Sequence, residues 1–131
     1  MILVDSDVII DFFAGTQPSA DLLTRLLTNH EALISSVSVF EILAGVTGKK
    51  RLRQIEELLS IVPVIDFNRL AAEKAAEIYT KLKKKGALVG NQDIFFAATA
   101  SCAGIPVLTR NVQHFKRISG VDVLRPKDFE Q

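Results

Sequence analysis

Four acidic side chains that lie far apart in the sequence have the residue type and the surroundings of a metal site. They are Asp5, Asp7, Glu41 and Asp93. Each stands either where an apolar strand is expected to meet a helix or within a helix that is apolar on nearly all its faces. Because stripping water from a carboxylate is costly, several carboxylates at the edges of apolar elements need a cation or strong hydrogen-bond donors. The pattern therefore predicts a catalytic site that holds a metal ion.

The composition indicates one packed domain that spans residues 1–131. The chain has 131 residues, of which 48% are hydrophobic, and it has only 7 glycines and 4 prolines, as is typical of a globular protein. The single cysteine, Cys102, excludes an internal disulfide framework and a thiolate zinc cluster. It lies in an apolar run, where we expect a small buried side chain.

The start of the chain favours a cytoplasmic protein without a membrane segment. Residues 1–4 are apolar and Asp5 follows at once, without a basic leader or a long apolar stretch. This pattern is typical of a buried strand rather than of a signal peptide.

The charges are nearly balanced overall but not evenly distributed. There are 16 Lys and Arg against 15 Asp and Glu, so setting aside the four candidate site acids leaves 16 bases against 11 acids. The bases cluster at 49–53, 81–85 and 110–117. An acidic pocket within a basic surround suits a polyanionic substrate. For 81–85 the favoured explanation is the helix dipole and a soluble surface, since lysines complement the end of a helix.

Short apolar runs alternate with longer stretches of helical periodicity. We expect strands at 2–4, 32–35, 62–65, 107–109 and 121–124, with the third near a sheet edge because of Pro63. Expected helices run from about 8 to 15, 18 to 27, 39 to 45, 48 to 60, 68 to 85 and 92 to 103. The expected N-caps are Ser6 or Asp7, Ser36 or Ser38, Asn68 and Asn91.

This alternation predicts an α/β fold, with a parallel sheet of about five strands between two layers of helices. In such sheets, ligands bind beyond the carboxyl ends of the strands, where the strand order reverses. Asp5 ends the first strand, and Thr109 and Asn111 end the fourth. If those two strands are neighbours, both turns face one cleft, and helices that begin nearby contribute Glu41 and Asp93.

Each acid also has a structural interpretation. Asp7 is suited either to capping the first helix or to contacting a metal through water. Glu41 is flanked by apolar residues, so a solvated helix face explains it poorly, although a salt bridge stays open. Asp93 lies in the first turn of a helix, where any acid gains from the dipole. Asp5 is the hardest to explain structurally, and Asp11 is expected to face solvent.

Taken in order, these motifs resemble the PIN-domain family, and within it the VapC-type ribonuclease toxins of type II toxin–antitoxin pairs. The resemblance covers Ile2 to about Leu124. It is carried by Asp5-Ser6-Asp7 after the first strand, Glu41 followed by Ile42, the run from Gly90 to Ala98 around Asp93, and Leu108-Thr109-Arg110-Asn111 with His114-Phe115.

The resemblance implies an endoribonuclease that depends on Mg²⁺ or Mn²⁺, forms a homodimer and is held inactive by an antitoxin protein. Asp5, Glu41 and Asp93 take the positions of the family's three acidic residues, which makes them the predicted catalytic residues and metal ligands. Asn111 occupies a fourth position that often holds Asp or Asn, and a neutral ligand there makes a tightly held second metal doubtful. His114 stands where some members have a further Asp, either as a substrate contact or as a partly exposed turn residue.

The predicted chemistry follows from charge. Unit charges about 4 Å apart repel by about 4 kcal/mol near a protein surface, so converging carboxylates need a divalent ion or a proton. Mg²⁺ is the natural partner for oxygen ligands, with Mn²⁺ as the alternative. We predict in-line attack by water on RNA, which leaves 5′-phosphate and 3′-hydroxyl ends. Ser6, Asp7, Thr109 and Asn111 are expected to support the site.

Two other classes of function stay open. Asp5-Ser6-Asp7-Val8 approaches the signature of haloacid-dehalogenase-like phosphatases, in which the first Asp is a nucleophile, although the chain has little room for their cap. A catalytically idle module that binds RNA or protein is the other, although such a module would be expected to have lost acids. The sequence does not identify which RNA is cut.

Overall fold

The centre of the fold is a five-stranded sheet in which every strand pair is parallel. The computed structural model describes residues 1–129. The strands are β1 (Ile2–Val4), β2 (Ala32–Ser35), β3 (Val64–Ile65), β4 (Val107–Leu108) and β5 (Val123–Leu124), in the order β3-β2-β1-β4-β5. Leu3 on β1 pairs with both Leu33 on β2 and Val107 on β4. The strand order therefore reverses at β1, between β2 and β4, and the predicted neighbours across the switch point are confirmed.

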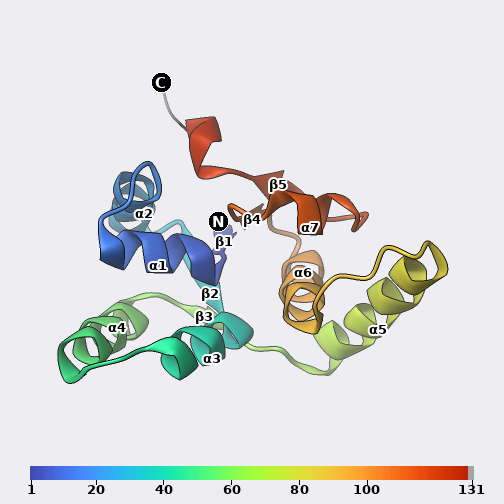
Figure 1. The fold of residues 1–131 in the computed structure, drawn as a ribbon, viewed down its shortest axis with the longest axis horizontal. Helices are drawn as coiled ribbons and strands as arrows, with labels where there is room; N and C mark the ends of the chain where they lie inside the picture. Colours follow the sequence, from blue (N-terminus) through green and yellow to red (C-terminus); the bar gives the residue numbers. More distant parts are fainter. Residues whose placement is uncertain (130–131) are drawn as a thin grey trace.

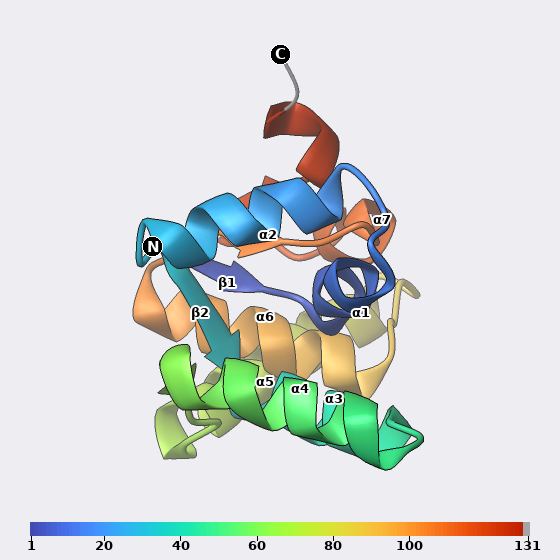
Figure 2. The ribbon, with the colours of Figure 1, turned by 90° about the vertical axis from the view of Figure 1, so that its left-hand side faces the viewer.

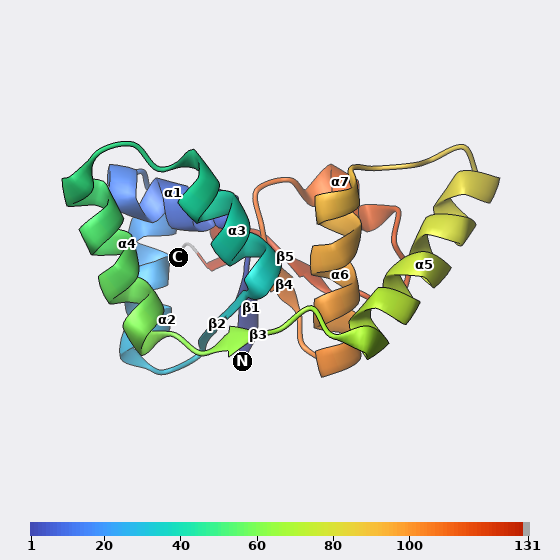
Figure 3. The same cartoon turned by 90° about the horizontal axis from the view of Figure 1, so that it is seen from below.

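Helices cover both faces of this sheet. They are α1 (Ser6–Ala14), α2 (Ser19–Thr28), α3 (Ser36–Gly45), α4 (Lys49–Ile61), α5 (Arg69–Lys84), α6 (Asn91–Ala103), α7 (Val112–Lys116) and the 3₁₀ helix η1 (Pro126–Phe129). In Figures 1 and 3, α1, α2, α3 and α4 lie on one side of the sheet, and α5 and α6 lie on the other. The predicted α/β architecture is confirmed.

The alternation of side chains along β1 explains why the core has two parts. Ile2 and Val4 pack with residues of α1, α2 and α4 on one face. Leu3 points to the opposite face, where it packs with residues of α5 and α6. Because successive side chains of a strand point to opposite faces, a strand that is apolar at every position must be covered on both. β1 is therefore fixed between two helical layers, and its carboxyl end has a defined position.

The helix starts differ from the sequence predictions at three of four sites. Asn68 caps α5 as predicted, because its side chain accepts from the Ala71 N–H. The cap of α1 is Asp5, not Ser6 or Asp7, and the cap of α3 is Ser35, not Ser36 or Ser38. Both strands run directly into their helices, so the last extended residue becomes the cap. The residue before α6 is Gly90, and Asn91 is already helical.

Two predictions about single side chains were wrong. Cys102 is exposed on the last turn of α6. Asp11 is only 7% exposed, because the turn into α2 folds back over α1 and the Ser19 hydroxyl donates to Asp11 Oδ2 at 3.1 Å. The edge position predicted for the strand after Pro63 is confirmed. No helix within residues 1–129 combines the length and the apolar character needed to cross a membrane.

Candidate active site

Asp5 joins the ends of the two strands that meet at the switch point. It follows β1, and its backbone N–H donates to the Leu108 carbonyl of β4 at 2.9 Å. Its Oδ1 accepts from the Ser6 N–H and its Oδ2 from the Thr109 hydroxyl, both at 2.8 Å. The side chain is 7% exposed. The predicted closeness of Asp5 and Thr109 is confirmed, and Asp5 both caps a helix and contributes a buried carboxylate.

Asp7 lies one step further along α1 and is held by the turn after β4. Its Oδ2 accepts from the Arg110 N–H at 3.0 Å and lies 3.4 Å from the Thr109 hydroxyl. The Arg110 guanidinium Nε lies 3.8 Å from Asp7 Oδ2 and 3.1 Å from Asp11 Oδ2. A single arginine thus partly compensates two acids of α1. Asp7 Oδ1 is buried and has no hydrogen-bond partner among residues 1–129.

Glu41 and Asp93 come from two helices that contact each other, α3 and α6. Both side chains are half-buried. Asp93 stands in the first turn of α6, and its Oδ2 lies 2.8 Å from Nδ1 of His114 on α7. No basic side chain within residues 1–129 forms an ion pair with Asp5 or Glu41, so the salt bridge considered for Glu41 is absent from the described chain.

The pKa shifts show that these acids act on one another. Burial raises the pKa of Asp5 to about 7, with a further rise from Asp7 and a smaller one from Glu41, against the hydrogen bonds from Thr109 and Ser6. Burial also raises the pKa of Glu41, followed by the charges of Asp93 and Asp7. The four acids therefore form one electrostatic unit.

The pKa of Asp7 is also raised, and burial is again the largest cause. Arg110 opposes this rise, first through its N–H and then through its positive charge. Asp7 is therefore partly neutralised by Arg110.

The donor set fits a hard divalent cation. All four acids supply oxygen ligands, which Mg²⁺ and Mn²⁺ prefer, and the partnerless, buried Asp7 Oδ1 is a polar atom that needs a donor or a cation. Within residues 1–129, no three Asp, Glu, His or Cys side chains already stand at the spacing of a closed metal cage. A cation would have to draw side chains together.

The predicted supporting residues lie around this group. Ser6 contacts Asp5 through its N–H, and its side chain partly offsets the raised pKa of Glu41. The Asn111 N–H donates to the Thr109 hydroxyl at 3.0 Å, which ties Asn111 to the same turn. His114 is half exposed on α7 and is joined to Asp93, whereas the sequence left its role open between a substrate contact and a turn residue.

Two residues near the acids were missed by the sequence reasoning. Arg110 was noted only as part of a basic cluster, and Asp11 was assigned to solvent. The spacing of Asp7 and Asp11 held a usable signal, because residues four apart share one face of a helix. The pairing of that face with Arg110 requires β1 and β4 to be neighbours, and single residues do not reveal this.

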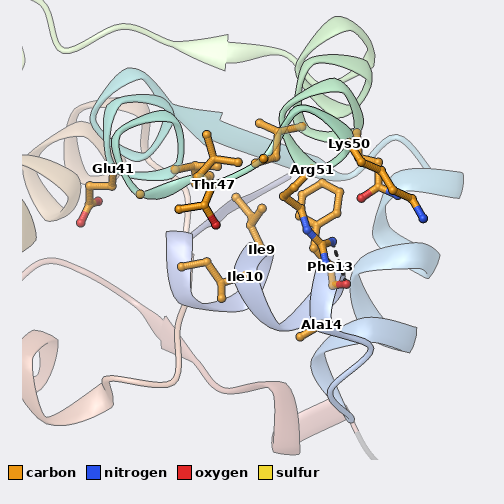
Figure 4. Close-up of a pocket in the computed structure, with 14 residues that line it drawn as sticks. Ile9, Ile10, Phe13, Ala14, Glu41, Thr47, Lys50 and Arg51 are labelled. Atoms are coloured by element: carbon orange, nitrogen blue, oxygen red, sulfur yellow. Dashed lines mark hydrogen bonds between the residues drawn. The ribbon is translucent and has the colours of Figure 1, made fainter.

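A groove with an apolar floor runs from Glu41 along α1. It is a cavity of about 680 Å³ between α1 and the segment that forms α3 and α4. We call it the apolar groove, after the lining residues Ile9, Ile10, Phe13, Ile42, Val46 and Ile55. Figure 4 shows Glu41 at one end, with Lys50 and Arg51 toward the other. Arg51 donates to the Phe13 carbonyl at 2.9 Å and lies over the Phe13 ring.

Comparison with known proteins defines the class. The family model of the PIN domain matches residues 2–121, so the chain belongs to the PIN-domain family, and the resemblance predicted from its motifs is confirmed. It is 32% identical to Ribonuclease VapC2 of Rickettsia felis over 100 residues, which cover 73% of this chain and 75% of that protein. It is 30% identical to the tRNA(fMet)-specific endonuclease VapC of Salmonella typhimurium over 101 residues, with 74% and 76% covered.

The fold agrees with a solved complex. The crystal structure of VapBC2 from Rickettsia felis bound to a promoter DNA fragment contains a chain with a TM-score of 0.82 and 27% identity, with 95% of this chain and 98% of that chain covered. The family assignment across nearly the whole chain disfavours the phosphatase alternative, which rested on a match of four residues.

Proposed function

We propose that this chain is an endoribonuclease and the toxin of a toxin–antitoxin pair. The observation that carries the proposal is the gathering of Asp5, Asp7, Glu41 and Asp93 around the carboxyl ends of β1 and β4, with Asp5 buried and charge-coupled to two of the others. Relatives in the same family are named ribonucleases. Retention of all these acids disfavours an idle module.

Asp5, Glu41 and Asp93 are the proposed ligands of Mg²⁺ or Mn²⁺. The bound ion supplies positive charge that polarises the scissile phosphate and lowers the pKa of a water molecule. Thr109 and the Ser6 N–H orient Asp5, and His114 orients Asp93. Arg110 keeps Asp7 turned toward β4 through its N–H. We propose RNA as the substrate, without naming a particular RNA, and the cytoplasm as the location. The homodimer expected for the family stays a prediction.

The apolar groove is the proposed seat of an antitoxin segment. Its floor is apolar, the Ile10 side chain is exposed, and a second hollow of about 660 Å³ shares Phe13 and Arg51 with it and extends toward Leu27 and Ile61. Such a surface suits the apolar face of a helix. The solved structures of similar chains include complexes named VapBC. A segment seated here would end beside Glu41 and so would obstruct the acids.

Cleavage of total RNA tests the activity. We expect cutting with Mg²⁺ or Mn²⁺, none with EDTA, and products with 5′-phosphate and 3′-hydroxyl ends. Asp93→Asn should lower the rate by at least about 100-fold, since it removes a charged ligand. Asp122→Asn is the matched control, because Asp122 is exposed and its side chain takes no part in the acidic group. Cleavage that survives EDTA, or that Asp93→Asn leaves intact, contradicts the proposal.

A further inference from the structure

Another cavity lies on the side of α1 away from the apolar groove. In Figure 2, α1 is seen end-on between α2 and the α3–α4 layer. This cavity has a volume of about 700 Å³ and is lined by the turn into α2, the segment after β4 and the start of η1. We call it the polar cavity, after the lining residues Gln17, Arg110, Gln113, His114, Arg125 and Lys127. Its size is in the range of pockets that hold small ligands, about 300–1,000 Å³.

Four of its polar side chains have no hydrogen-bond or ion-pair partner within residues 1–129, whereas the other six do. Gln17 is bonded to Asp21, Arg125 to Asp128 at 2.9 Å, and Arg110 to the acids of α1. The four groups without such a partner are the Thr16 hydroxyl, the Asn111 and Gln113 amides and the Lys127 ammonium group, and all four residues are exposed. The cavity therefore presents two amides, each with a donor and an acceptor, beside a cation that has no acidic partner within residues 1–129.

The polar cavity shares a wall with the acidic group. The Arg110 N–H donates to Asp7, the Asn111 N–H donates to Thr109, and His114 contacts Asp93. All three residues also line the cavity. A linear molecule whose reacting bond lies at the acids can place the neighbouring unit here or in the apolar groove.

The two cavities differ in the chemistry of their lining side chains, so they suit different ligands. None of the large exposed hydrophobic side chains of residues 1–129 lines the polar cavity, whereas Ile10 lines the apolar groove. A docked protein segment would lack an apolar anchor in the polar cavity. A nucleotide would find a cation for its phosphate, guanidinium planes for stacking and an amide for its base edge.

We propose that the polar cavity is a nucleotide subsite, which holds the unit of single-stranded RNA next to the bond that is cut. Lys127 contacts the phosphate of that nucleotide, and Gln113 hydrogen-bonds its base and so contributes to sequence preference. This inference rests on the proposed ribonuclease function. It adds a specificity-determining site outside the acidic group.

The phosphate contact is tested with Lys127→Glu, with Lys84→Glu as the control of equal charge change at an exposed position of α5 that lines neither cavity. We expect Lys127→Glu to raise KM for RNA about tenfold, to leave kcat within about twofold, and to lower the salt dependence of binding. Lys84→Glu should change KM by less than about threefold. Equal effects of the two variants would mean general electrostatics alone and would overturn the subsite.

The base contact is tested by cutting a randomised RNA library and sequencing the ends. Gln113→Ala should relax the base preference at one position beside the cut, while Gln54→Ala, a matched change on the far side of α1, should not. An unchanged preference in Gln113→Ala overturns the base contact. Weaker binding of the antitoxin by Lys127→Glu, with KM for RNA unchanged, would assign the cavity to a protein segment and overturn the proposal.

Binding measurements distinguish failure of the subsite from failure of the proposed function. A fluorescein-labelled RNA of six nucleotides is titrated in EDTA, where no cutting is expected. If the wild-type chain cuts no RNA but Lys127→Glu still weakens this binding about tenfold, the ribonuclease proposal fails and the cavity remains an RNA site. If the wild-type chain cuts RNA and Lys127→Glu binds the oligonucleotide as tightly as wild type, only the subsite fails.

Discussion

The two cavities that flank α1 differ in chemistry although one nine-residue helix lines both. Ile9, Ile10 and Phe13 of α1 contribute to the apolar groove, whereas Asp11 contributes to the polar cavity. At 100° per residue, the three apolar positions cluster on one side of the helix, and Asp7 and Asp11 cluster on another. Asp5 caps the start of this helix, so both faces lead to the same acidic group.

This difference indicates how one short domain can bring two different ligands to the same acidic group. Each of the two cavities beside α1 holds one of them, the proposed antitoxin segment or the proposed RNA. The apolar face suits a partner that excludes water, and the polar face suits a charged chain that keeps much of its hydration. The groove reaches the acids through Glu41, and the polar cavity reaches them through Arg110 and His114. Changes on one face should therefore affect one ligand and spare the other.

The largest expected effect is on the pH dependence of stability, and it concerns Asp5, in the acidic group to which both faces of α1 lead. In EDTA, Asp5 should make the protein less stable as pH rises, because a raised carboxyl pKa favours the folded state at low pH and this advantage is lost as the pH rises toward about 7. With an ordinary pKa of about 3.9 in the unfolded chain, the loss between pH 5 and pH 8 is about 2 to 3 kcal/mol. The raised pKa values of Asp7 and Glu41 act in the same direction.

Chemical denaturation at both pH values measures this effect. Asp5→Asn removes the titrating group, so it should lose most of the pH dependence and be more stable than wild type at pH 8, while its RNA cleavage is lost. Asp122→Asn should keep the wild-type pH dependence. If Asp5→Asn and wild type lose stability equally between pH 5 and pH 8, then Asp5 is not the buried acid that the site requires.

The sequence predicted the elements that bring the acids together but not how the acids are held. Ile2, Leu3 and Val4 are apolar at every position, which indicates a strand covered on both faces, and Asp5 after them marks the strand end. Asp5 was not predicted as a helix cap, because a cap depends on how abruptly a strand becomes a helix. The position of this transition is set by the backbone dihedral angles, which the residue types alone do not determine.

The partners that compensate the charges of the acids could not be predicted from local sequence patterns. Asp11 looks like a solvent-facing residue until α2 folds over it and Ser19 and Arg110 approach its carboxylate. His114 and Asp93 lie on different helices, so no spacing rule links them. The individual acids could be chosen from sequence, whereas their partners required the strand order.

A smaller effect is expected on the polar side of α1. Arg110→Gln removes the cation that lies 3.1 Å from Asp11 and 3.8 Å from Asp7. Two nearly buried carboxylates then remain without it, so we expect a loss of about 2 kcal/mol of unfolding free energy at pH 7. This is less than for a fully buried pair because Arg110 is half exposed. Thermal denaturation checks the loss.

The double variant Arg110→Gln with Asp11→Asn sharpens this test. It should recover at least half of the lost stability, because the second change removes one of the uncompensated charges. If adding Asp11→Asn gives no recovery, the arginine stabilises the fold through packing alone, and the polar face is not organised by this ion pair.

The smallest effect is expected on the apolar side. Ile10 is 56% exposed in the groove, so Ile10→Gln should leave folding and RNA cleavage nearly unchanged but weaken inhibition by the proposed antitoxin about tenfold. That factor corresponds to about 1.4 kcal/mol, within the range for burying such a side chain. Inhibition is measured with the proposed antitoxin, which is to be sought as the product of a short reading frame beside this chain's gene. Leu70→Gln is the control, since Leu70 is 67% exposed on α5, away from both cavities. If Ile10→Gln also raises KM for RNA while Lys127→Glu does not, the ligands of the two faces must be exchanged.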